Sequence, residues 1–379
     1  MEQSVKDILA DDFWIMPATP EYIDKGVPYI TSKNIKNGTI DFSKVNYISQ
    51  EDYEYISKNR PILVGDILIS MIGTLGETAE VKETDGLFYG QNMFLVRIDE
   101  SKVNKRYFLN FFKSNCVKRA LKGKQNQSTQ KYLKANHIED LIIPVPDVTK
   151  QELIAKQLDK LTYIITLRTN ELKQLDDLIK ARFVEMFGDC TNMISLSDLC
   201  LIITDGTHQS PKFQHEGIPF ILVSNLSKNT VTYDTDKFIS AETYKELYKR
   251  TPIEIGDILL STVGSYGHPA VVVEDRKFLF QRHIAYLKPK SDILNSYYMH
   301  GALLSPGCQR QIEEKVKGIA QKTLNLSEIR KIRIPVPSLD LQKQYADFVH
   351  QVNKSKVAVQ KALDETQMLF DSLMQEYFN

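Results

Sequence analysis

Residues 65–76 read GDILISMIGTLG and residues 256–267 read GDILLSTVGSYG, so one pattern occurs twice at a shift of 191 positions. Seven of the twelve aligned pairs are identical. In both copies an apolar run follows Gly-Asp and ends at two glycines that are three residues apart. This arrangement predicts a short buried strand that stops at a tight turn. The repeated strand therefore indicates that the chain contains two copies of one structural unit.

The same shift of 191 relates other parts of the chain. The matching segments are 26–30 (GVPYI) with 217–221 (GIPFI), 143–146 with 334–337 (both IPVP), Gln151 with Gln342, and Phe187 with Phe378. The repeat covers nearly the whole sequence, and its period is far longer than that of solenoid repeats. Each copy is therefore expected to be a domain with its own core, in a molecule with pseudo-two-fold symmetry.

Each copy divides at its Pro-Val-Pro sequence. Short apolar stretches punctuated by Gly, Asn and Pro precede it and are typical of strands and turns, while 108–122 is expected to be helical. A long segment without Pro or Gly follows, with apolar residues at heptad spacing, which predicts a coiled coil. Asp147 is a candidate N-cap for the first such helix. The alternative is two separate amphipathic helices, each packed on its own domain.

The predicted fold class is α+β, with two mixed α/β domains separated by a pair of long antiparallel helices. The expected boundaries are domains at 1–146 and 189–337 and spacer helices at 147–188 and 338–379. The residues expected to form the helix-pair interface are Leu158, Leu161, Ile165, Leu172, Leu175, Ile179, Val349, Val352, Val359, Leu363, Phe370 and Leu373.

Composition excludes several classes of protein. The chain has 379 residues, of which 42% are hydrophobic and 25% charged, as in globular proteins. Its four cysteines form no CxxC pair, which argues against a zinc ribbon or a redox motif. The N-terminus lacks the apolar core of a signal peptide, and no run of about 18 apolar residues occurs. We therefore expect a soluble, cytoplasmic protein.

No motif for catalysis, cofactor binding or metal binding stands out. The sequence contains no phosphate-binding loop, no dinucleotide-binding GxGxxG and no HExxH. His208 and His215 have no third ligand nearby, and the carboxylates around Asp147 lack the spacing of a nuclease site. The expectation is a chain that is not an enzyme and holds no cofactor and no metal.

The net charge of zero, from 48 basic and 48 acidic residues, hides a strong local imbalance. Residues 101–138 contain ten Lys or Arg and no Asp or Glu, whereas residues 1–100 contain nine basic and seventeen acidic residues. The basic stretch includes QNQSTQ at 125–130. Amide side chains can bond adenine edges while lysines bind phosphates, so this segment is a candidate DNA contact. A solvated polar loop is the alternative.

Taken together, these features resemble the specificity subunit of type I restriction-modification systems. The resemblance is carried by the paired Gly-Asp-Ile-Leu strands with their Gly-x-x-Gly turns, by the two Ile-Pro-Val-Pro sequences, and by Gln151 and Gln342 after them. The sequence DGTH at 205–208 is also similar to a common opening of the family's target domains, although the first copy has PATP at 17–20 nearby instead.

The resemblance implies that each domain reads one half of a split target in double-stranded DNA. The helix pair would set the gap between the halves and dock two adenine methyltransferase subunits, which restriction and translocase subunits would join. The alternative is a non-catalytic coiled-coil scaffold whose basic patch binds a partner other than DNA. The candidate DNA-contacting residues are Lys33, Asn34, Thr74, Gln91, Asn92, Lys122, Lys124, Gln125, Asn126, Gln127, Ser128, Lys131, Thr207, His208, Ser224, Asn225, Ser265, Tyr266, His268, Arg282, His283, Lys317, Gln321 and Lys322.

Overall fold

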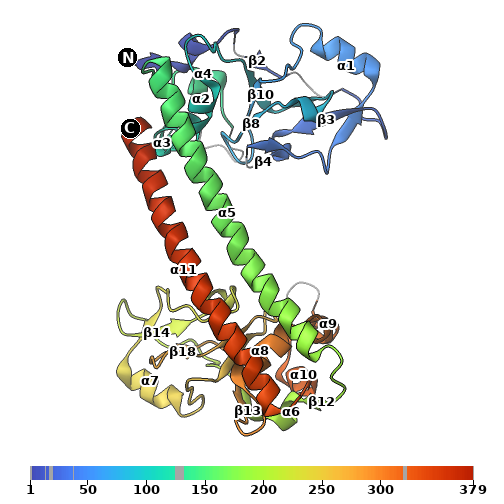
Figure 1. Ribbon diagram of the computed structural model, residues 1–379, viewed down its shortest axis with the longest axis vertical. Coiled ribbons are helices and arrows are strands. Elements are labelled where there is room, and N and C mark those ends of the chain that lie inside the picture. Colours follow the sequence, from blue (N-terminus) through green and yellow to red (C-terminus); the bar gives the residue numbers. More distant parts are fainter. Residues whose placement is uncertain are drawn as a thin grey trace. The chain divides into compact units, whose positions relative to one another are not determined.

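The computed structural model describes residues 2–12, 14–16, 20–36, 38–123, 132–318 and 322–378. They form two compact units, one made of Met1–Arg168 with Ala362–Asn379 and the other of Thr169–Lys361. Both units contain strands and helices, as Figure 1 shows, so the predicted α+β class with two mixed domains is confirmed.

The first unit contains two larger sheets and the two-stranded sheets β1-β11 and β4-β5. A four-stranded antiparallel sheet has the order β2-β10-β7-β8, and a three-stranded sheet has the order β6-β3-β9, in which β3 and β9 run parallel. Its strands are β1 (Glu2–Ser4), β2 (Trp14–Ile15), β3 (Val27–Thr31), β4 (Ile35–Lys36), β5 (Thr39–Ile40), β6 (Asn46–Ile48), β7 (Ile67–Ser70), β8 (Thr78–Glu80), β9 (Tyr89–Gln91), β10 (Met93–Val96) and β11 (Ile142–Pro144). Its helices are η1 (Val5–Ile8), η2 (Ser32–Asn34), α1 (Gln50–Ser57), η3 (Glu83–Asp85), α2 (Lys105–Phe112), α3 (Asn115–Gly123) and α4 (Ala135–Glu139).

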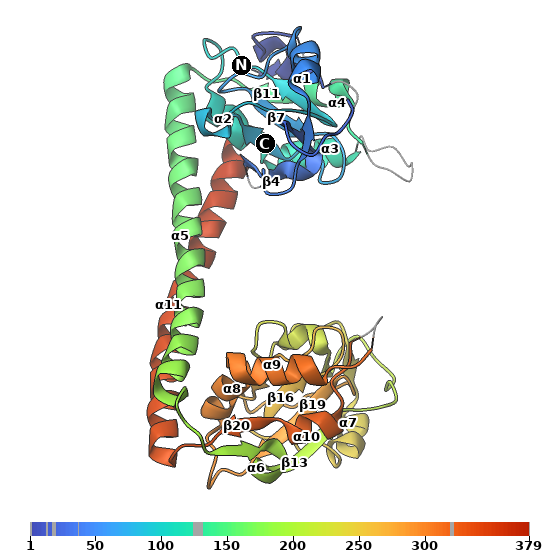
Figure 2. The same ribbon diagram turned by 90° about the vertical axis from the view of Figure 1, so that its right-hand side faces the viewer.

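The second unit repeats this plan with sheets in the order β13-β19-β16-β17 and β15-β14-β18. Figure 2 shows α8 and α9 beside β16 of this unit. Its strands are β12 (Met193–Ser195), β13 (Cys200–Asp205), β14 (Ile218–Ile221), β15 (Phe238–Ile239), β16 (Ile258–Ser261), β17 (Pro269–Val271), β18 (Leu279–Phe280), β19 (Ile284–Pro289) and β20 (Arg333–Pro335). Its shorter helices are α6 (Leu196–Leu199), η4 (Val223–Leu226), α7 (Ala241–Tyr248), α8 (Ser296–Leu304), α9 (Pro306–Lys315) and α10 (Leu326–Lys331).

The strand that follows Gly-Asp, β7 in the first unit and β16 in the second, is an inner strand of the four-stranded sheet of each unit. In β7, Ile67 and Ile69 enter the core that α2 and α3 cover, while Leu68 enters a second core shared with β3 and β9. A strand buried on both faces reads as a continuous apolar run, which is why GDILI lacks polar alternation. Gly73 and Gly76 end the turn with φ of 81° and 76°, which an L side chain rarely adopts. The predicted buried strand and its glycine turn are confirmed.

The buried acid before each strand is matched by a cation from the neighbouring strand or its end. The Asp66 carboxylate accepts from the backbone N–H of Leu63 at 2.7 Å and from Arg97 Nε at 2.7 Å. Asp257, its counterpart, accepts from the N–H of Glu254 at 2.8 Å and pairs with Lys288 at 3.2 Å. A buried carboxylate is tolerated only when it is paired and hydrogen-bonded. These contacts therefore explain how the aspartate of the Gly-Asp sequence can be buried in both units.

The expected single helix at 108–122 is two helices. The chain leaves α2 after Phe112, and Ser114 starts α3 by accepting the N–H of Val117 on its hydroxyl at 3.3 Å. Serine favours helix starts because its hydroxyl satisfies an N–H that has no partner within the helix. Hydrophobic periodicity alone did not reveal this break.

The long helices are α5 (Val148–Phe187) and α11 (Leu339–Phe378). Asp147 caps α5, since its carboxylate accepts the N–H of Lys150 at 3.0 Å. Each unit contains the start of one long helix and the end of the other. In the first unit Tyr377 Oη donates to Gln157 Oε1 at 3.0 Å, and in the second Lys356 pairs with Asp176 at 2.5 Å. The two helices are therefore antiparallel wherever they meet.

One buried glutamine ties the start of each long helix to its unit. Gln151 is fully buried; its Oε1 accepts the N–H of Asn104 at 2.8 Å, and its Nε2 donates to the carbonyls of Lys102 (3.2 Å) and Pro146 (2.8 Å). Gln342 makes the same three bonds, to Asn295 N–H (2.8 Å), Ile293 O (3.1 Å) and Pro337 O (3.0 Å). Every partner is displaced by the same 191 positions.

We predict that Gln151→Ala exposes the amide of Asn104, and that Gln342→Ala exposes the amide of Asn295. Removing each side chain leaves backbone groups without partners, at about 1–3 kcal/mol for a buried unsatisfied group. Hydrogen exchange measures this directly, because each substitution should lower protection only in its own unit. Gln344→Ala, at an exposed position of α11, is the control. Unchanged protection at Asn104 and Asn295 would show that the glutamines do not fix these segments.

Candidate nucleic-acid interface

The turn after each central strand presents a hydroxyl side chain to solvent. In the first unit Ser70 Oγ donates to the carbonyl of Thr74 and accepts the N–H of Glu77 at 2.9 Å. In the second unit Ser261 Oγ accepts the N–H of His268 at 2.9 Å. These buried serines hold the turns, and the side chains of Thr74 and Ser265 at the tips are exposed. Thr74 and Ser265, both predicted to contact DNA, thus lie at accessible tips of hydrogen-bonded turns.

A hollow in the second unit gathers polar residues from four segments of the chain. Its volume is about 460 Å³, and it is lined by Asp205, Thr262, Val263, Arg282, His283, Thr323, Leu324, Asn325 and Leu326. Backbone bonds between Thr207 and Phe280 (3.0 Å) and between Arg282 and Thr207 (3.1 Å) bring the DGTH turn beside it. The structure therefore brings together the predicted residues Thr207, His208, Arg282 and His283, which are 74 to 76 positions apart between the two pairs.

In the described part of the chain, the one acidic side chain of this hollow, Asp205, is paired, whereas the arginine Arg282 is not paired with a carboxylate. The Asp205 carboxylate is occupied by Arg250 at 2.6 Å and by His208 at 3.0 Å. Arg282 Nε donates to His283 Nε2 at 3.3 Å. Burial, and then the charge of Arg282, lower the pKa of His283 below its ordinary value, so the neutral ring that accepts this bond is favoured. Arg282 is exposed, and among the residues that the structure describes its terminal NH₂ groups form no ion pair.

The first unit has the same frame with different side chains. Met71 N–H donates to Asn92 O at 3.2 Å, as Thr262 N–H donates to His283 O at 3.0 Å. Asn92 has a φ of 60°, and Gln91 Nε2 donates to Tyr22 Oη at 3.2 Å. Gln91 and Asn92 therefore occupy the positions that Arg282 and His283 occupy in the second unit.

Asn34 and Asn225 do not fit the predicted role in DNA contact. Both are buried, and Asn34 uses its whole amide inside the unit: Oδ1 accepts Thr31 N–H at 2.9 Å, and Nδ2 donates to Asp41 O (2.8 Å) and Lys44 O (3.0 Å). Asn225 does the same with Leu222 N–H (2.9 Å) and Asp234 O (2.9 Å). Both amide nitrogens donate to partners within the units, so the prediction that Asn34 and Asn225 contact DNA is wrong.

The other predicted residues are spread over the two units. Lys33, Ser224 and Lys317 are exposed, and Lys322 is exposed with its Nζ 5.9 Å from the ring centre of the half-buried Tyr266. His268 is half-buried, with Nδ1 3.0 Å from Asn229 Oδ1. Lys122 is exposed on α3, beside Lys118 and Arg119, which were not selected. The predicted residues Lys124, Gln125, Asn126, Gln127, Ser128, Lys131 and Gln321 lie outside the described residues.

The residues of the predicted helix-pair interface form a continuous less-exposed stripe. All twelve are buried or half-buried, and Arg168 and Arg182, which interrupt the apolar heptads of α5, are half-buried as well. The ends of the helices also pack on the units: Leu158 and Phe378 join one core of the first unit, and Phe187 and Val349 join one core of the second. The ends of the long helices therefore pack against the cores of the units, and the twelve interface residues stay a prediction.

Within the described ranges, no group of three or more His, Cys, Asp or Glu side chains is placed to hold a metal ion. None of the helices in that part of the chain is both long enough and apolar enough to cross a membrane.

Comparison with known proteins supplies the family. The model of the type I restriction modification DNA specificity domain matches residues 15–177 and again residues 191–366. The specificity subunit of the type I restriction enzyme EcoBI from Escherichia coli is 23% identical over 92% of this chain and 78% of its own length. The MjaVIII specificity subunit from Methanocaldococcus jannaschii is 18% identical over 90% of this chain and 84% of its own length.

A solved structure agrees in fold. The S subunit of a type I restriction-modification system from M. genitalium matches all of this chain and 96% of its own chain with a TM-score of 0.58 at 13% identity. The two matched segments of the family model coincide with the two copies of the internal repeat. The chain belongs to the type I restriction-modification DNA specificity family and carries two copies of its defining domain.

Proposed function

We propose that the chain is a non-catalytic DNA-reading subunit and that each of its recognition domains reads one half of a bipartite target. The observation that supports this proposal is the duplication of one hydrogen-bonded backbone frame with different side chains at corresponding positions. Thr74, Gln91 and Asn92 in the first unit correspond to Ser265, Arg282 and His283 in the second. Sequence is read by side chains that reach base edges, so one frame with two sets of side chains suits two different half-sites.

The recognition domains of the proposal are residues 1–146 and 189–337, and the spacers are residues 147–188 and 338–379. Half-sites that are read from one face of a duplex lie about one helical turn apart. The lengths of α5 and α11 would then set the number of unread base pairs between the halves. The buried glutamines support this role, because they bind the start of each spacer to the domain before it.

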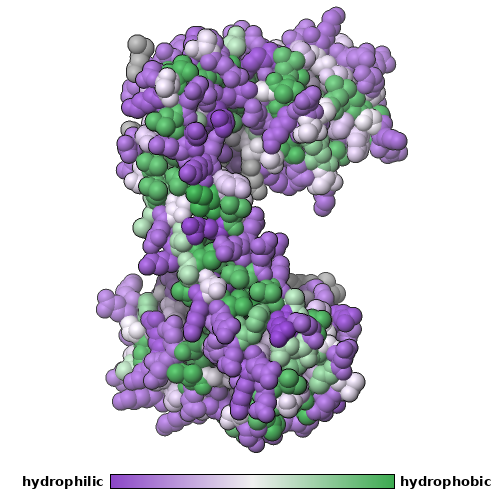
Figure 3. Space-filling model, in the orientation of Figure 1, coloured by the Kyte–Doolittle hydropathy of each residue, from purple (hydrophilic) through white to green (hydrophobic). Residues whose placement is uncertain are grey.

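The proposed partners are two adenine methyltransferase subunits, which supply catalysis, together with restriction and translocase subunits, all in the cytoplasm. Exposed apolar side chains on the long helices support docking of protein partners. They include Tyr163 (63% exposed), Val357 (70%) and Met368 (67%), and Figure 3 shows apolar patches over these helices. Exposed apolar surface of this kind is typical of interaction sites.

Arg282 is the proposed base reader of the second half-site. Its Nε is engaged by His283, so its two terminal nitrogens can act as a fork, and an arginine fork pairs best with O6 and N7 of guanine. The nearest carboxylate in the hollow, that of Asp205, is already bound by Arg250 and His208. Within the hollow Arg282 is therefore available to a ligand.

We predict that the chain, produced with its cognate methyltransferase, directs adenine methylation to a bipartite motif with a fixed gap. Genome-wide sequencing of methylated adenines measures this. Replacing residues 1–146 by the equivalent domain of a relative should change one half of the motif and leave the other half and the gap unchanged.

A continuous motif, or no methylation with a methyltransferase that is active with a related specificity subunit, would contradict the proposal. The scaffold alternative predicts the second of these results together with binding of a protein partner that is independent of DNA.

We predict that Arg282→Ala relaxes one guanine position of the second half-site, at about 1–3 kcal/mol of discrimination, and leaves the first half-site unchanged. Compared with Arg282→Ala, Arg282→Lys should restore the affinity for DNA more than the discrimination between bases. Lysine carries the positive charge but cannot form the two parallel hydrogen bonds of arginine. The measurement is the base frequency at each motif position. Arg310→Ala, also an exposed arginine of the second unit, is the matched control. A uniform loss over all positions would assign Arg282 to phosphate contact instead.

A further inference from the structure

A strongly basic surface lies on and beside α3 of the first unit. Lys113, Lys118, Arg119 and Lys122 are all exposed, while the inward side of the same helix is anchored by the buried Val117 and Leu121. Four positive side chains thus lie within ten residues, three of them on α3 and one, Lys113, just before it, and the buried contacts of α3 are made by other residues.

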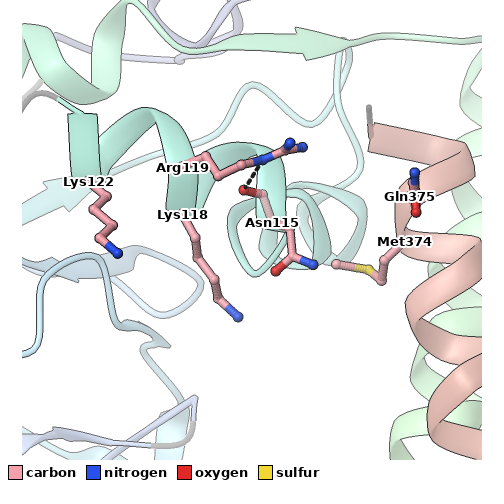
Figure 4. A pocket seen from close by; sticks show the side chains of 6 residues that line it. All are labelled: Asn115, Lys118, Arg119, Lys122, Met374 and Gln375. Carbon is pink, nitrogen blue, oxygen red and sulfur yellow. Dashed lines mark hydrogen bonds between the residues drawn. The ribbon is translucent and has the colours of Figure 1, made fainter. Parts of the chain in front are cut away.

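Two hollows border this face. One of about 370 Å³ lies between α3 and the end of α11 and is lined by Asn115, Lys118, Arg119, Lys122, Met374 and Gln375. Figure 4 shows the side chains of Lys118 and Lys122 extending into the same open space. The other, of about 560 Å³, lies between α3 and the turn that contains Gly76 and Glu77, and both lysines line it as well.

These lysines are not neutralised within the first unit. In the part of the chain that the structure describes, Lys105 and Arg106 pair with carboxylates, but no ion pair is formed by Lys113, Lys118 or Lys122. A single carboxylate, that of Glu77, shares the larger hollow with these three lysines. Like charges at i and i+4, as at Lys118 and Lys122, destabilise a helix slightly. An anionic ligand would relieve this repulsion.

The second unit keeps the packing of this helix, but at the four corresponding positions it keeps one basic residue and gains one acidic residue. At the same shift of 191, α9 retains buried residues where α3 has Val117 and Leu121. The four basic positions become Leu304, Gln309, Arg310 and Glu313. Gln309 is also tied down, since its Nε2 donates to Gly267 O at 3.0 Å and to Leu303 O at 2.8 Å. The charge of α3 is therefore a property of one copy and not a requirement of the fold.

We infer that the basic face of α3 binds the phosphodiester backbone of DNA, and that the corresponding face of α9 does not. The inference rests on the proposed function and adds to it that the first unit supplies more of the sequence-independent, salt-dependent affinity. Lysine and arginine are the usual phosphate ligands and carry no sequence information there. Lysine is depleted at the centres of protein–protein interfaces, which argues against this face as a docking site for another subunit.

The test is the salt dependence of DNA binding by the assembled complex with its methyltransferase. Each phosphate contact contributes about 0.9 to the slope of log affinity against log salt. Lys118→Ala with Lys122→Ala should reduce the slope by about 2, so that the fall in affinity between 50 and 200 mM salt is about tenfold smaller than for the unmodified complex. The loss should be equal for duplexes with and without the methylated motif. Glu313→Lys, in the second unit, should steepen the slope.

The matched control is Lys245→Ala with Lys249→Ala, two exposed lysines at the same spacing at α7 of the second unit. A thermal melt verifies folding of each variant. An unchanged slope for the α3 variant, an equal reduction for the control, or loss of methyltransferase co-purification with DNA binding otherwise intact would each overturn the inference. Failure of the unmodified complex to methylate a bipartite motif would instead count against the proposed function.

Discussion

Each unit is completed by the end of a helix that begins in the other unit, and the rest of the structure depends on this exchange. In the first unit the ring of Phe378 lies 5.1 Å from Tyr107, and in the second the ring of Phe187 lies 4.9 Å from Tyr298. Burying such a side chain contributes about 1.5–3 kcal/mol, beyond which aromatic pairs add about 0.5–1.5 kcal/mol. Gln151 and Gln342 hold the helix starts, so within each unit the start of one long helix is fixed to the neighbouring backbone of that unit.

The duplication separates what the fold needs from what recognition needs. The residues that stabilise the backbone are identical in the two copies. They are Gln151 and Gln342, Asp66 and Asp257, and the serines Ser70 and Ser261 of the two turns. Exposed positions on that frame have changed, so that Gln91 corresponds to Arg282 and Lys118 to Gln309. This is the pattern expected where two copies keep one architecture and read different ligands. It also explains a net charge of zero in a DNA-binding chain, since the basic residues are concentrated locally.

Much of the fold could be predicted from the sequence, because backbone requirements leave strong signals. Gly73 and Gly76 mark positive φ, Asp147 marks a helix start, and the apolar run from Ile67 marks a strand buried on both faces. The site was less predictable, because a polar residue in a turn looks the same whether it faces inward or outward. The sequence predicts Asn34 and Asn225 as DNA contacts, yet their amides hold loops inside the units. Conversely, Lys118 and Lys122 are four residues apart, which is about one helical turn. This spacing alone predicts that both lysines lie on the same face of a helix.

The account is tested most directly by lengthening both spacers together. One heptad inserted after Arg168 in α5 and one after Val359 in α11 preserves the packing stripe and adds about 10 Å to each helix. The measurement is the methylation motif of the resulting complex. The account predicts that both half-sites keep their sequences while the gap between them widens by about three base pairs, at 3.4 Å per pair. An unchanged gap with both half-sites intact would show that the helix pair does not set their distance.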